Sequence, residues 1–568
     1  MKVRKNNIRE LVFIILAIIL CLASVLFYNL DKHFAFQWII FSIWIIGVII
    51  VLLPVIFFFL ENRCSLIKNN RELLFVILIT LGSAFLRFYK ITKIPLLNGD
   101  EARDTGFLPE VFLKGEVKDF FGYGVYGIPN MFFALSSIPH LLFGHSILAI
   151  RFFAAFFGTL AIILVYLLAK KLFNQRVAVI STILMSCYHV HLQFSRSEFI
   201  NNFDSFWAPL IIVLLLKSIK EKPYYSLLFG LFLGIASHFY QGIRAVLAFS
   251  TAFFLIYNLV YYHKKLNRFL AKIGFFSLGL FLGLGPSIVI IAIRPNEFFN
   301  TGTAGGPLFS SLGLLGFLEL LPSRLLHSFG ALIYYPIEFH YHYGGPFLQF
   351  PLNLFSIIGL FFLLRNLAKK ESSILLFWIV AVIFCNSALL QGLNHTHRLL
   401  SVVPALMIVS GLGIVKLSMI FKKWPAVYRS IMFLAVFLPT FLNLKNYFYD
   451  SIWKNAYDTN TKVAAVAGYY TAGFPPNAKF YFLNSPRMSW KSGPSWEYIA
   501  PAAQVKDLEE GNLQSVFPVS TREKERLVFI ALPEKTEALK MIEEVWTKGY
   551  RKDHYYDNEL LFITYELK

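Results

Sequence analysis

Apolar runs of about twenty residues recur along almost the whole chain. A run of this length is long enough to cross the hydrocarbon core of a bilayer as one α-helix. The composition agrees, because 57% of the residues are hydrophobic, only 15% are charged and the mean hydropathy is +0.60. Soluble domains carry roughly 25% charged residues. The sequence therefore predicts a polytopic α-helical membrane protein.

The pattern predicts about thirteen transmembrane helices, some of them short and with soft boundaries. They cover residues 11–30, 37–60, 73–89, 148–169, 177–191, 204–216, 224–239, 245–262, 273–293, 351–364, 373–390, 399–416 and 427–444. The 568 residues of the chain leave room for a modest soluble domain besides these spans.

Positive charge gathers in alternate connections between these runs, which by the positive-inside rule are cytoplasmic. The clusters lie at residues 2–9, 63–71, 170–176, 217–222, 264–272, 365–370 and 416–423. The intervening short connections hold a single Lys or Arg each and are predicted to face outward. An odd number of spans then places the C-terminal tail outside. The first run also fits a signal peptide, but its length favours an uncleaved helix.

The net charge of +20 would also suit a nucleic-acid-binding protein. Such a protein needs a soluble basic face, whereas Lys and Arg here lie in short clusters between apolar runs, as topogenic charges beside lipid headgroups do. The cysteines Cys21, Cys64, Cys187 and Cys385 lie in or beside apolar runs and form no CxxC pair. We therefore expect no nucleic-acid partner, no disulfide framework and no zinc site based on cysteine.

Two outward connections are long, at about residues 90–147 and 294–350. The first contains an apolar piece, "PNMFFALSSIPHLLFG", which is too short to span comfortably and is predicted to be an interfacial or re-entrant helix. The second is rich in glycine and aromatic residues and too apolar for a disordered segment. Loops of this length in a folded protein are usually functional.

The tail after residue 445 changes character. "AKFYFLN", "LVFIALP" and "ELLFITYEL" read as strands, and "EKTEALKMIEEVW" has helical spacing. We predict three parts: membrane helices in residues 1–72, a transmembrane catalytic module in residues 73–445, and a small extracytoplasmic α/β domain in residues 446–568.

The densest charge cluster lies in the first long loop, in "LLNGDEARDTGF", residues 96–107. Asp100 and Glu101 follow a turn-forming Asn-Gly pair that can fold them back towards the helices. A solvated loop is the plain alternative. Other outward loops are poor in charge, however, and ionisable residues kept at a membrane are often functional.

This stretch resembles the Asp-Glu pair of the polytopic GT-C glycosyltransferases, closest to the bacterial members related to protein O-mannosyltransferases and to the lipid A aminoarabinose transferase. Further similar stretches are "GHSILAIRFFAAFFGTLAIILVYLLAKKLF", "HVHLQFSRSEFINNFDSFW" and "NHTHRLLSVVPALMIVSGLGI". The resemblance covers roughly residues 73–420. It implies a GT-C fold and a sugar transferase that takes its donor from a polyprenyl phosphate in the membrane.

The resemblance also implies roles for single residues. Asp100 inherits the catalytic carboxylate with Glu101 as its partner, and Arg103 is a donor-phosphate contact. Some relatives have a Tyr where this chain has Asp104. They also carry an Asn-Lys-Pro-Pro stretch later in the loop, where this chain reads "YGVYGIPN" without a lysine.

The expected chemistry fits these residue types. Glycosyl transfer to a hydroxyl needs a base for the acceptor proton, and a positioned carboxylate is suitable. A single carboxylate opposite the leaving group favours inversion. The leaving phosphate needs positive charge, which outward arginines supply by bidentate contacts. The candidates besides Arg103 are Arg151, Arg196, Arg244 and Arg398.

A second acidic or metal-binding group remains an open alternative. Glu198 and Asp204 either add a carboxylate to the pocket or cap the following helix. Histidines at i, i+2 spacing would share one side of a strand or loop and allow a divalent metal site, although interfacial histidines are more common. These pairs are His189/His191, His340/His342 and His395/His397.

We therefore predict an integral-membrane glycosyltransferase of a prokaryotic plasma membrane, with its active site on the extracytoplasmic face. Its partners are a polyprenyl-phosphate-linked sugar, membrane lipids and an acceptor that is a glycan, a lipid or a protein. The alternative is a transporter or flippase of lipid-linked sugars. That class predicts charges or broken helices at the bilayer midplane, and neither is evident in the sequence.

Overall fold

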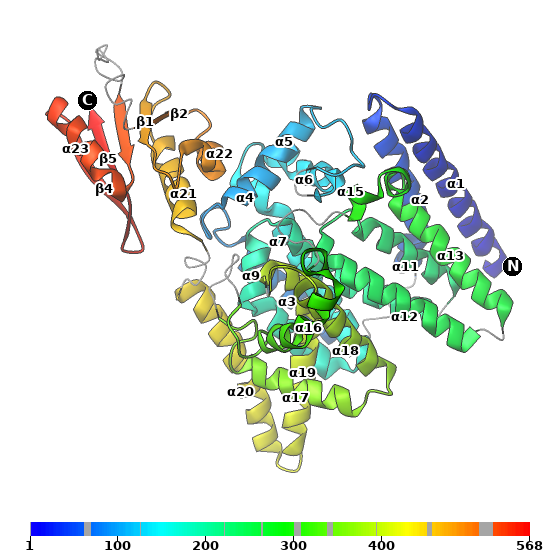
Figure 1. Ribbon diagram of the computed structural model, residues 1–568. Helices are drawn as coiled ribbons and strands as arrows, with labels where there is room; N and C mark the ends of the chain where they lie inside the picture. Colours follow the sequence, from blue (N-terminus) through cyan, green and yellow to red (C-terminus); the bar gives the residue numbers. More distant parts are fainter. Residues whose placement is uncertain are drawn as a thin grey trace.

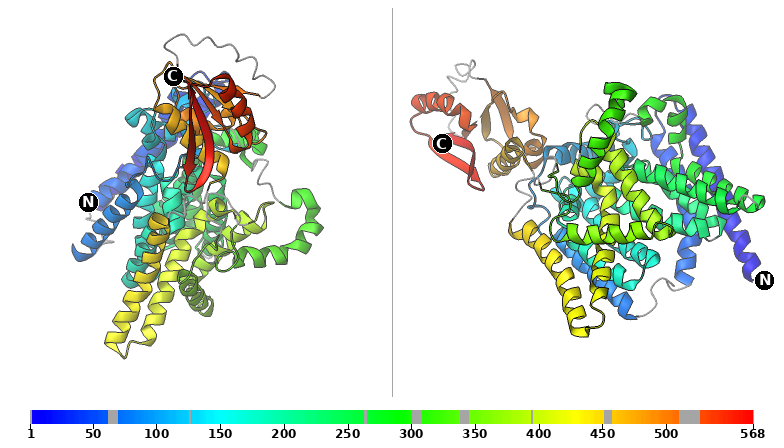
Figure 2. Two further views of the ribbon diagram at one scale, coloured as in Figure 1. Left: turned by 90° about the vertical axis from the view of Figure 1, so that its left-hand side faces the viewer. Right: turned by 60° about the horizontal axis from the view of Figure 1, so that its bottom comes forward.

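A computed structural model describes residues 2–61, 70–124, 127–220, 222–262, 265–299, 308–337, 345–393, 395–450, 457–509 and 526–567. A helical body makes up most of the molecule, and a small mixed α/β domain lies at one end of it (Figures 1 and 2). The polytopic helical fold with a C-terminal sheet, predicted from the sequence, is confirmed in this outline.

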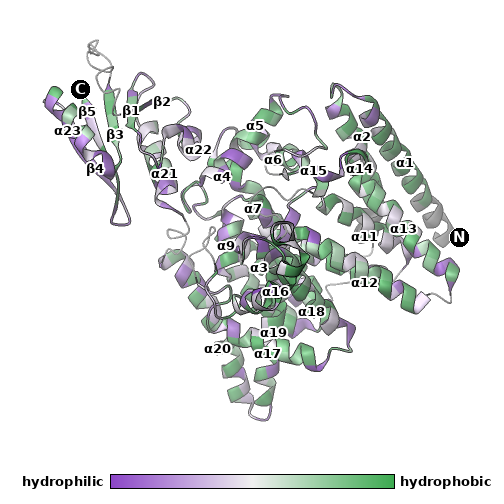
Figure 3. Cartoon of the chain, viewed as in Figure 1, coloured by the Kyte–Doolittle hydropathy of each residue, from purple (hydrophilic) through white to green (hydrophobic). Residues whose placement is uncertain are grey.

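The helical body begins with the hairpin of α1 (Lys2–Leu30) and α2 (Gln37–Glu61). The helices that coincide with the other predicted spans follow in chain order, and apolar residues run along most of them (Figure 3). They are α3 (Asn70–Phe88), α7 (Ile147–Leu172), α8 (Gln175–Cys187), α9 (His189–Arg196), α10 (Asp204–Lys220), α11 (Pro223–Ala236), α12 (Arg244–Tyr262), α13 (Leu266–Leu284), α14 (Ser287–Ile293), α17 (Leu352–Arg365), α18 (Lys370–Ile383), α19 (Val403–Ile420) and α20 (Pro425–Leu444).

All thirteen predicted spans fall on these helices, but their number as membrane crossings is not confirmed. In the described residues eight helices are long and apolar enough to cross a membrane, or nine if the bent pair α8 and α9 counts as one span. Several predicted spans correspond to shorter apolar helices, including α11 and α17. These two helices have only 14 residues each, which is shorter than a comfortable membrane crossing.

Glycines let two helix pairs approach very closely. A Cβ added to Gly279 of α13 would lie 2.0 Å from the Leu227 carbonyl oxygen of α11, and one added to Gly283 would lie 2.1 Å from that of Leu231. Gly359 of α17 and the backbone of α19 are equally close, since a Cβ there would lie 2.1 Å from the Val409 oxygen. Small residues at such crossings replace the missing hydrophobic driving force with close packing.

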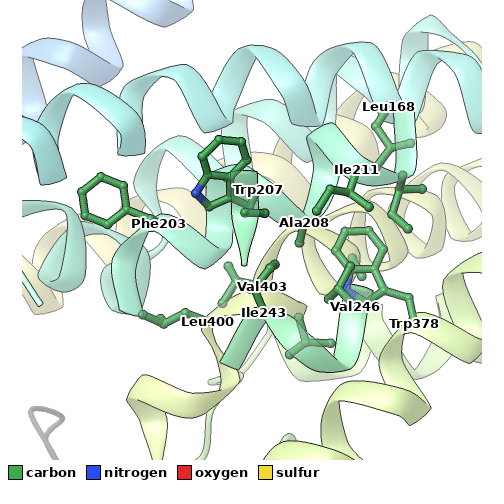
Figure 4. Close-up of a cluster of buried hydrophobic side chains, with 14 of the residues drawn as sticks. Leu168, Phe203, Trp207, Ala208, Ile211, Ile243, Val246, Trp378, Leu400 and Val403 are labelled. Carbon is green, nitrogen blue, oxygen red and sulfur yellow. The ribbon is translucent and has the colours of Figure 1, made fainter. Parts of the chain in front are cut away.

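Large apolar side chains fill the centre of the body, where α10, α12, α18 and α19 meet. Figure 4 shows Phe203 beside Trp207 at one end of the cluster, Ile243 in the middle, and Val246 and Trp378 at the other end. All five side chains are buried. This core supports the loops in which the predicted site residues lie.

The first long loop is mostly helical. It holds α4 (Gly99–Glu101), the π-helix η1 (Ala102–Phe107), α5 (Leu108–Leu113) and α6 (Asn130–Phe143). The last of these is the predicted short apolar helix. In the second loop the structure has α15 (Pro295–Phe299) and the 22-residue α16 (Phe309–Gly330), a helix that the sequence pattern did not indicate. Gly313 at φ 70° and Pro322 interrupt its apolar spacing.

The C-terminal domain has a five-stranded sheet in the order β2-β1-β3-β5-β4, parallel for β2, β1 and β3 and antiparallel for the rest. Helices cover both faces. The elements are α21 (Thr459–Ala472), β1 (Lys479–Leu483), η9 (Trp490–Ser492), α22 (Pro494–Ile499), β2 (Gln504–Leu508), β3 (Leu527–Ala531), η11 (Pro533–Lys535), α23 (Thr536–Val545), β4 (Tyr550–Tyr556) and β5 (Glu559–Leu567). The three strands and the helix predicted here are confirmed, and β2, β4, α21 and α22 are additions.

The alternation of side chains along β1 explains the two-sided cover. Phe480 and Phe482 pack with Trp496 and the residues of α21, whereas Leu483 packs on the opposite face with Leu539 and Ile542 of α23. Successive strand residues point to opposite faces, so one strand contributes to both cores.

Candidate functional site

Asp100 and Glu101 lie on a short turn that is fixed by local capping. The Asn98 side chain accepts a hydrogen bond from the Asp100 amide at 2.8 Å. In return, the Glu101 carboxylate accepts one from the Asn98 amide at 3.1 Å. This reciprocal pattern is the capping box of α4. The Asn-Gly pair predicted to turn the chain does so, with Asn98 as the N-cap.

Glu101 is fully buried and forms an ion pair with Arg151, which opens α7. The Arg151 Nε and Nη2 atoms donate to the two oxygens of the carboxylate, each at 2.9 Å. The same carboxylate also accepts a hydrogen bond from the Glu198 amide at 2.9 Å. All of its contacts are with the protein itself. Glu101 therefore holds the turn in place and presents no free oxygen to a substrate.

Arg151 uses its remaining donors on the backbone before α4. Nη1 donates to the carbonyl oxygens of Ile91 and Pro95, both at 2.8 Å, and Nη2 donates to that of Leu96 at 2.9 Å. The five N–H groups of a guanidinium are thereby all occupied. With these partners, Arg151 has no further N–H group for the predicted phosphate contact.

Arg196 likewise donates to backbone carbonyl groups, at the end of α3 and in the turn that follows it. Its Nη1 atom donates to the carbonyl oxygens of Leu86 and Arg87, at 2.5 and 3.1 Å, and Nη2 donates to those of Tyr89 and Ile94, at 2.7 and 3.0 Å. Helix C-termini leave such carbonyls without helical partners. Arg196 is fully buried; its Nη1 and Nη2 atoms make these contacts, whereas its Nε atom has no hydrogen-bond partner among the described residues.

Asp100, in contrast, is accessible: 36% of its side chain is exposed. Its carboxylate lies 3.0 Å from Arg103 Nη1. Arg103 also donates from Nε and Nη2 to Asp104, at 2.6 and 2.9 Å. Burial raises the pKa of Asp104. The residue that some relatives replace by Tyr is therefore a second carboxyl group on Arg103.

Glu198 and Asp204 are the two carboxyl groups predicted as a second acidic site. Glu198 packs directly behind Glu101. Its Oε2 atom accepts a hydrogen bond from the Ala154 amide at 2.8 Å. Burial raises the pKa of Glu198 well above its usual value, and the nearby Glu101 charge adds to this. Glu198 thus belongs to the cluster that supports the turn.

Asp204 is fully buried at the start of α10, and neither of its oxygens has a hydrogen-bond partner in the structure as described. It lies against Gly242, where a Cβ would be 2.5 Å from Oδ2. The Asn386 side chain connects the same turn to the predicted Arg398, donating to the Gly242 oxygen at 2.7 Å and to the Arg398 oxygen at 3.0 Å. Sequence order did not reveal this proximity.

The described residues contain no group of three or more His, Cys, Asp or Glu side chains that could hold a metal ion. The histidines with i, i+2 spacing that lie in these ranges therefore form no such group. The His189 ring lies 2.6 Å from the Asn443 side-chain oxygen. His191 lies 2.6 Å from Arg87 Nη2 on one side and 3.1 Å from the Ser205 hydroxyl on the other. The rings of His395 and His397 are 5.6 Å apart. His340 and His342 lie outside the described residues.

The C-terminal domain packs directly on the first loop through α22, a contact that no sequence pattern indicated. The Tyr498 ring stacks on His145 at 3.9 Å, and the Tyr498 carbonyl oxygen lies 2.8 Å from His145 Nε2. The other ring nitrogen of His145 lies 2.7 Å from Glu110. Gly106 of η1 faces the same tyrosine, so closely that a Cβ there would lie 2.7 Å from its ring.

Comparison with known proteins bears on this arrangement. Residues 128–285 match the family model of dolichyl-phosphate-mannose-protein mannosyltransferases. The structure is similar to ArnT from Cupriavidus metallidurans bound to undecaprenyl phosphate, with a TM-score of 0.50 and 12% identity, over 86% of this chain and 97% of that one. The chain has the GT-C fold. Since its helices have the length and composition of membrane spans, it is an integral membrane protein of this fold.

Two further similarities involve archaeal proteins. The dolichyl-phosphooligosaccharide-protein glycotransferase 2 of Pyrococcus furiosus is 24% identical over 253 residues, which are 41% of this chain. The chain spans about a third of the length of that relative, 32%. The oligosaccharyltransferase of Archaeoglobus fulgidus in its apo form gives a TM-score of 0.48 at 16% identity, over 86% of this chain and 70% of that one.

Proposed function

We propose that this GT-C protein is a glycosyltransferase that moves a sugar from a polyprenyl-phosphate carrier to an acceptor hydroxyl. The observation that carries the proposal is Asp100, an accessible carboxylate on a preformed turn that is braced from behind by a fully buried ion pair. A reacting group needs this combination of access and fixed position.

The reaction is a single displacement. The Asp100 carboxylate accepts the proton of the acceptor hydroxyl while the hydroxyl oxygen forms a bond to the anomeric carbon. The bond between that carbon and the phosphate oxygen breaks, and its electron pair leaves with the polyprenyl phosphate. Attack opposite the leaving group inverts the anomeric configuration.

The neighbouring residues have supporting roles. Glu101 and Arg151 are positioning residues, because their contacts fix the turn and leave no atom for substrate. Arg103 orients Asp100 through their 3.0 Å ion pair. Arg103 in this loop and Arg398 in a later one stay the proposed contacts to the donor phosphate. The undecaprenyl phosphate in the ArnT structure supports a donor of the same chemical class.

We place the active site on the extracytoplasmic face of the plasma membrane, as the distribution of positive charge among the loops predicts. The acceptor belongs to the same face. The proposal does not involve a metal ion, since no residue in it requires one.

The test uses membranes that contain the full chain and a panel of radiolabelled polyprenyl-phosphate sugars. We expect transfer to an endogenous acceptor by the wild type and a loss of at least 100-fold for Asp100→Asn, in line with the usual contribution of general bases. Glu116→Gln is the matched control, because Glu116 is an exposed carboxylate of the same loop. It is expected to keep wild-type activity.

Equal transfer by the wild type and Asp100→Asn would show that Asp100 is not the general base. A complete lack of transfer from every donor would contradict the transferase itself and favour movement of lipid-linked sugars across the membrane.

A further inference from the structure

His145 connects the C-terminal domain to the loop that carries Asp100. It lies in the short link between α6 and α7. Its Nδ1 atom is 2.7 Å from the Glu110 carboxylate of α5, and its Nε2 atom is 2.8 Å from the carbonyl oxygen of Tyr498 on α22. The ring of His145 also stacks on the ring of Tyr498. One side chain therefore contacts both the first loop and the C-terminal domain.

The two hydrogen-bond partners determine the protonation state of the His145 ring. A carbonyl oxygen only accepts hydrogen bonds, so Nε2 must carry a proton. The carboxyl group of a glutamate is ionised at neutral pH and also only accepts, so Nδ1 must carry a proton as well. A ring with both protons is the imidazolium cation. In the neutral ring, one nitrogen lone pair would face an acceptor oxygen.

The other titratable groups among the described contacts of this pair are His140 on α6 and Tyr498. Burial lowers the pKa of His140, and its Nδ1 atom lies 3.0 Å from the Ser136 carbonyl oxygen. Burial raises the pKa of Tyr498, whose hydroxyl donates to Glu110 at 3.4 Å. Both groups are therefore neutral near neutral pH. The side chain of His145 is 35% exposed, so the surrounding water can protonate and deprotonate it.

Glu110 connects this contact to the acidic turn through a continuous helical segment. The elements α4, η1 and α5 follow one another without a break, with Asp100 near the start and Glu110 near the end. Tyr498 packs against the middle of the segment, edge-on to the Phe107 ring at 5.2 Å and against Gly106. The C-terminal domain therefore holds the segment at its centre, and His145 holds it at its end.

We propose that His145 is a positioning residue for the acidic turn, and that its imidazolium form holds the C-terminal domain on the segment of residues 99–113. Loss of one proton removes one of its two hydrogen bonds and its attraction to Glu110. The contact is thus complete in a mildly acidic medium and weakens as the pH rises through the range in which histidines titrate, at about pH 6.5. The contact follows from the geometry, whereas its effect on sugar transfer rests on the proposed function.

The experiment measures amide hydrogen exchange in residues 99–113 of the full chain in nanodiscs. Rates at about pH 5.5 and about pH 8.5, on either side of the histidine range, are divided by the intrinsic rate at each pH. We expect the protection of the wild type to fall about tenfold between them, as the loss of one charge-assisted hydrogen bond predicts. His145→Gln does not titrate and is expected to show low protection at both values. His145→Lys keeps a cation and is expected to be equally protected at both.

Two further variants complete the experiment. His33→Gln changes an exposed histidine between α1 and α2 and is the control, expected to follow the wild type. Glu110→Gln places an amide opposite Nδ1, which can pair with either form of the ring. We expect its protection to be the same at both pH values. The thermal midpoint of each variant shows whether it is folded, and Glu110→Gln decides the question if His145→Gln is not.

Equal protection of the wild type at the two pH values overturns the proposal. The same pH dependence in a folded His145→Gln or Glu110→Gln variant also overturns it. The transfer assay keeps this result apart from the proposed function. If protection changes with pH as expected while no donor supports transfer, the role of His145 stands and the glycosyltransferase proposal fails. If transfer requires Asp100 while protection is independent of pH, only the role of His145 fails.

Discussion

Two fully buried arginines, Arg151 and Arg196, organise the backbone that leads to Asp100. Together they donate to seven backbone carbonyl oxygens between Leu86 and Leu96. From the sequence, an arginine at the start of an outward loop suits a phosphate contact equally well. Only the burial and the hydrogen-bond partners show that the guanidinium groups are used inside the protein.

The ion pair of Arg151 and Glu101 leads to a prediction about stability. Arg151→Gln leaves a buried carboxylate without its partner, and breaking one half of a buried pair costs about 3–5 kcal/mol. We expect a clear fall of the Tm in detergent, by the same amount with and without undecaprenyl phosphate. Arg429→Gln, at an exposed arginine of α20, is expected to leave the Tm unchanged. A variant that keeps its Tm but loses lipid binding would restore the phosphate role of Arg151.

Helix packing shows how far pattern reasoning reaches at the level of elements. Every predicted span lies on a helix, because hydrophobic runs of this length are a strong signal. The helix α16 was missed because Gly313 and Pro322 disturb its spacing. Which helices touch was beyond the sequence, since the close approach of α11 and α13 depends on the rotation of both helices about their axes.

The crossing of α11 and α13 supplies an element-scale prediction. Gly279→Ala places a methyl group 2.0 Å from the Leu227 oxygen, so the helices must separate. Overpacking of this kind costs about 1–3 kcal/mol. The matched control is Gly274→Ala on the same helix, where an added Cβ meets nothing within 4 Å. We expect a lower Tm for the first variant and an unchanged or raised Tm for the second. Equal values would show that the helices part without cost.

The contact between the C-terminal domain and the first loop belongs to the scale of the whole molecule. Tyr498 and Leu97 share a buried cluster with Ala102 and Ile150, so the domain packs on the turn that carries Asp100. The helical body alone therefore does not complete the surroundings of the site. A domain more than three hundred residues further along the chain fixes one side of it.

Removing this contact should loosen the acidic turn. Tyr498→Ala deletes the stack on His145 and leaves a void next to Gly106, at a cost of about 3–5 kcal/mol for a buried aromatic residue. We expect faster amide hydrogen exchange in residues 99–113 and reduced transfer. Tyr555→Ala, at a 59% exposed tyrosine of β4, is the control. Unchanged exchange in Tyr498→Ala would mean that the helical body holds the turn without help.

The sequence by itself determined the class of the molecule, the positions of the helices that coincide with the predicted spans, and the loop that holds the candidate base. These follow from local patterns, namely the length of apolar runs, the distribution of charge and the Asn-Gly turn before Asp100. The tertiary structure alone decided which charged groups are free. Glu101 and Arg151 satisfy each other and the backbone, whereas Arg244 and the Nε atom of Arg196 keep donors without a partner among the described residues. The physical reason is that a hydrogen bond or an ion pair depends on partners brought together from distant parts of the chain, and spacing along the sequence does not encode that proximity.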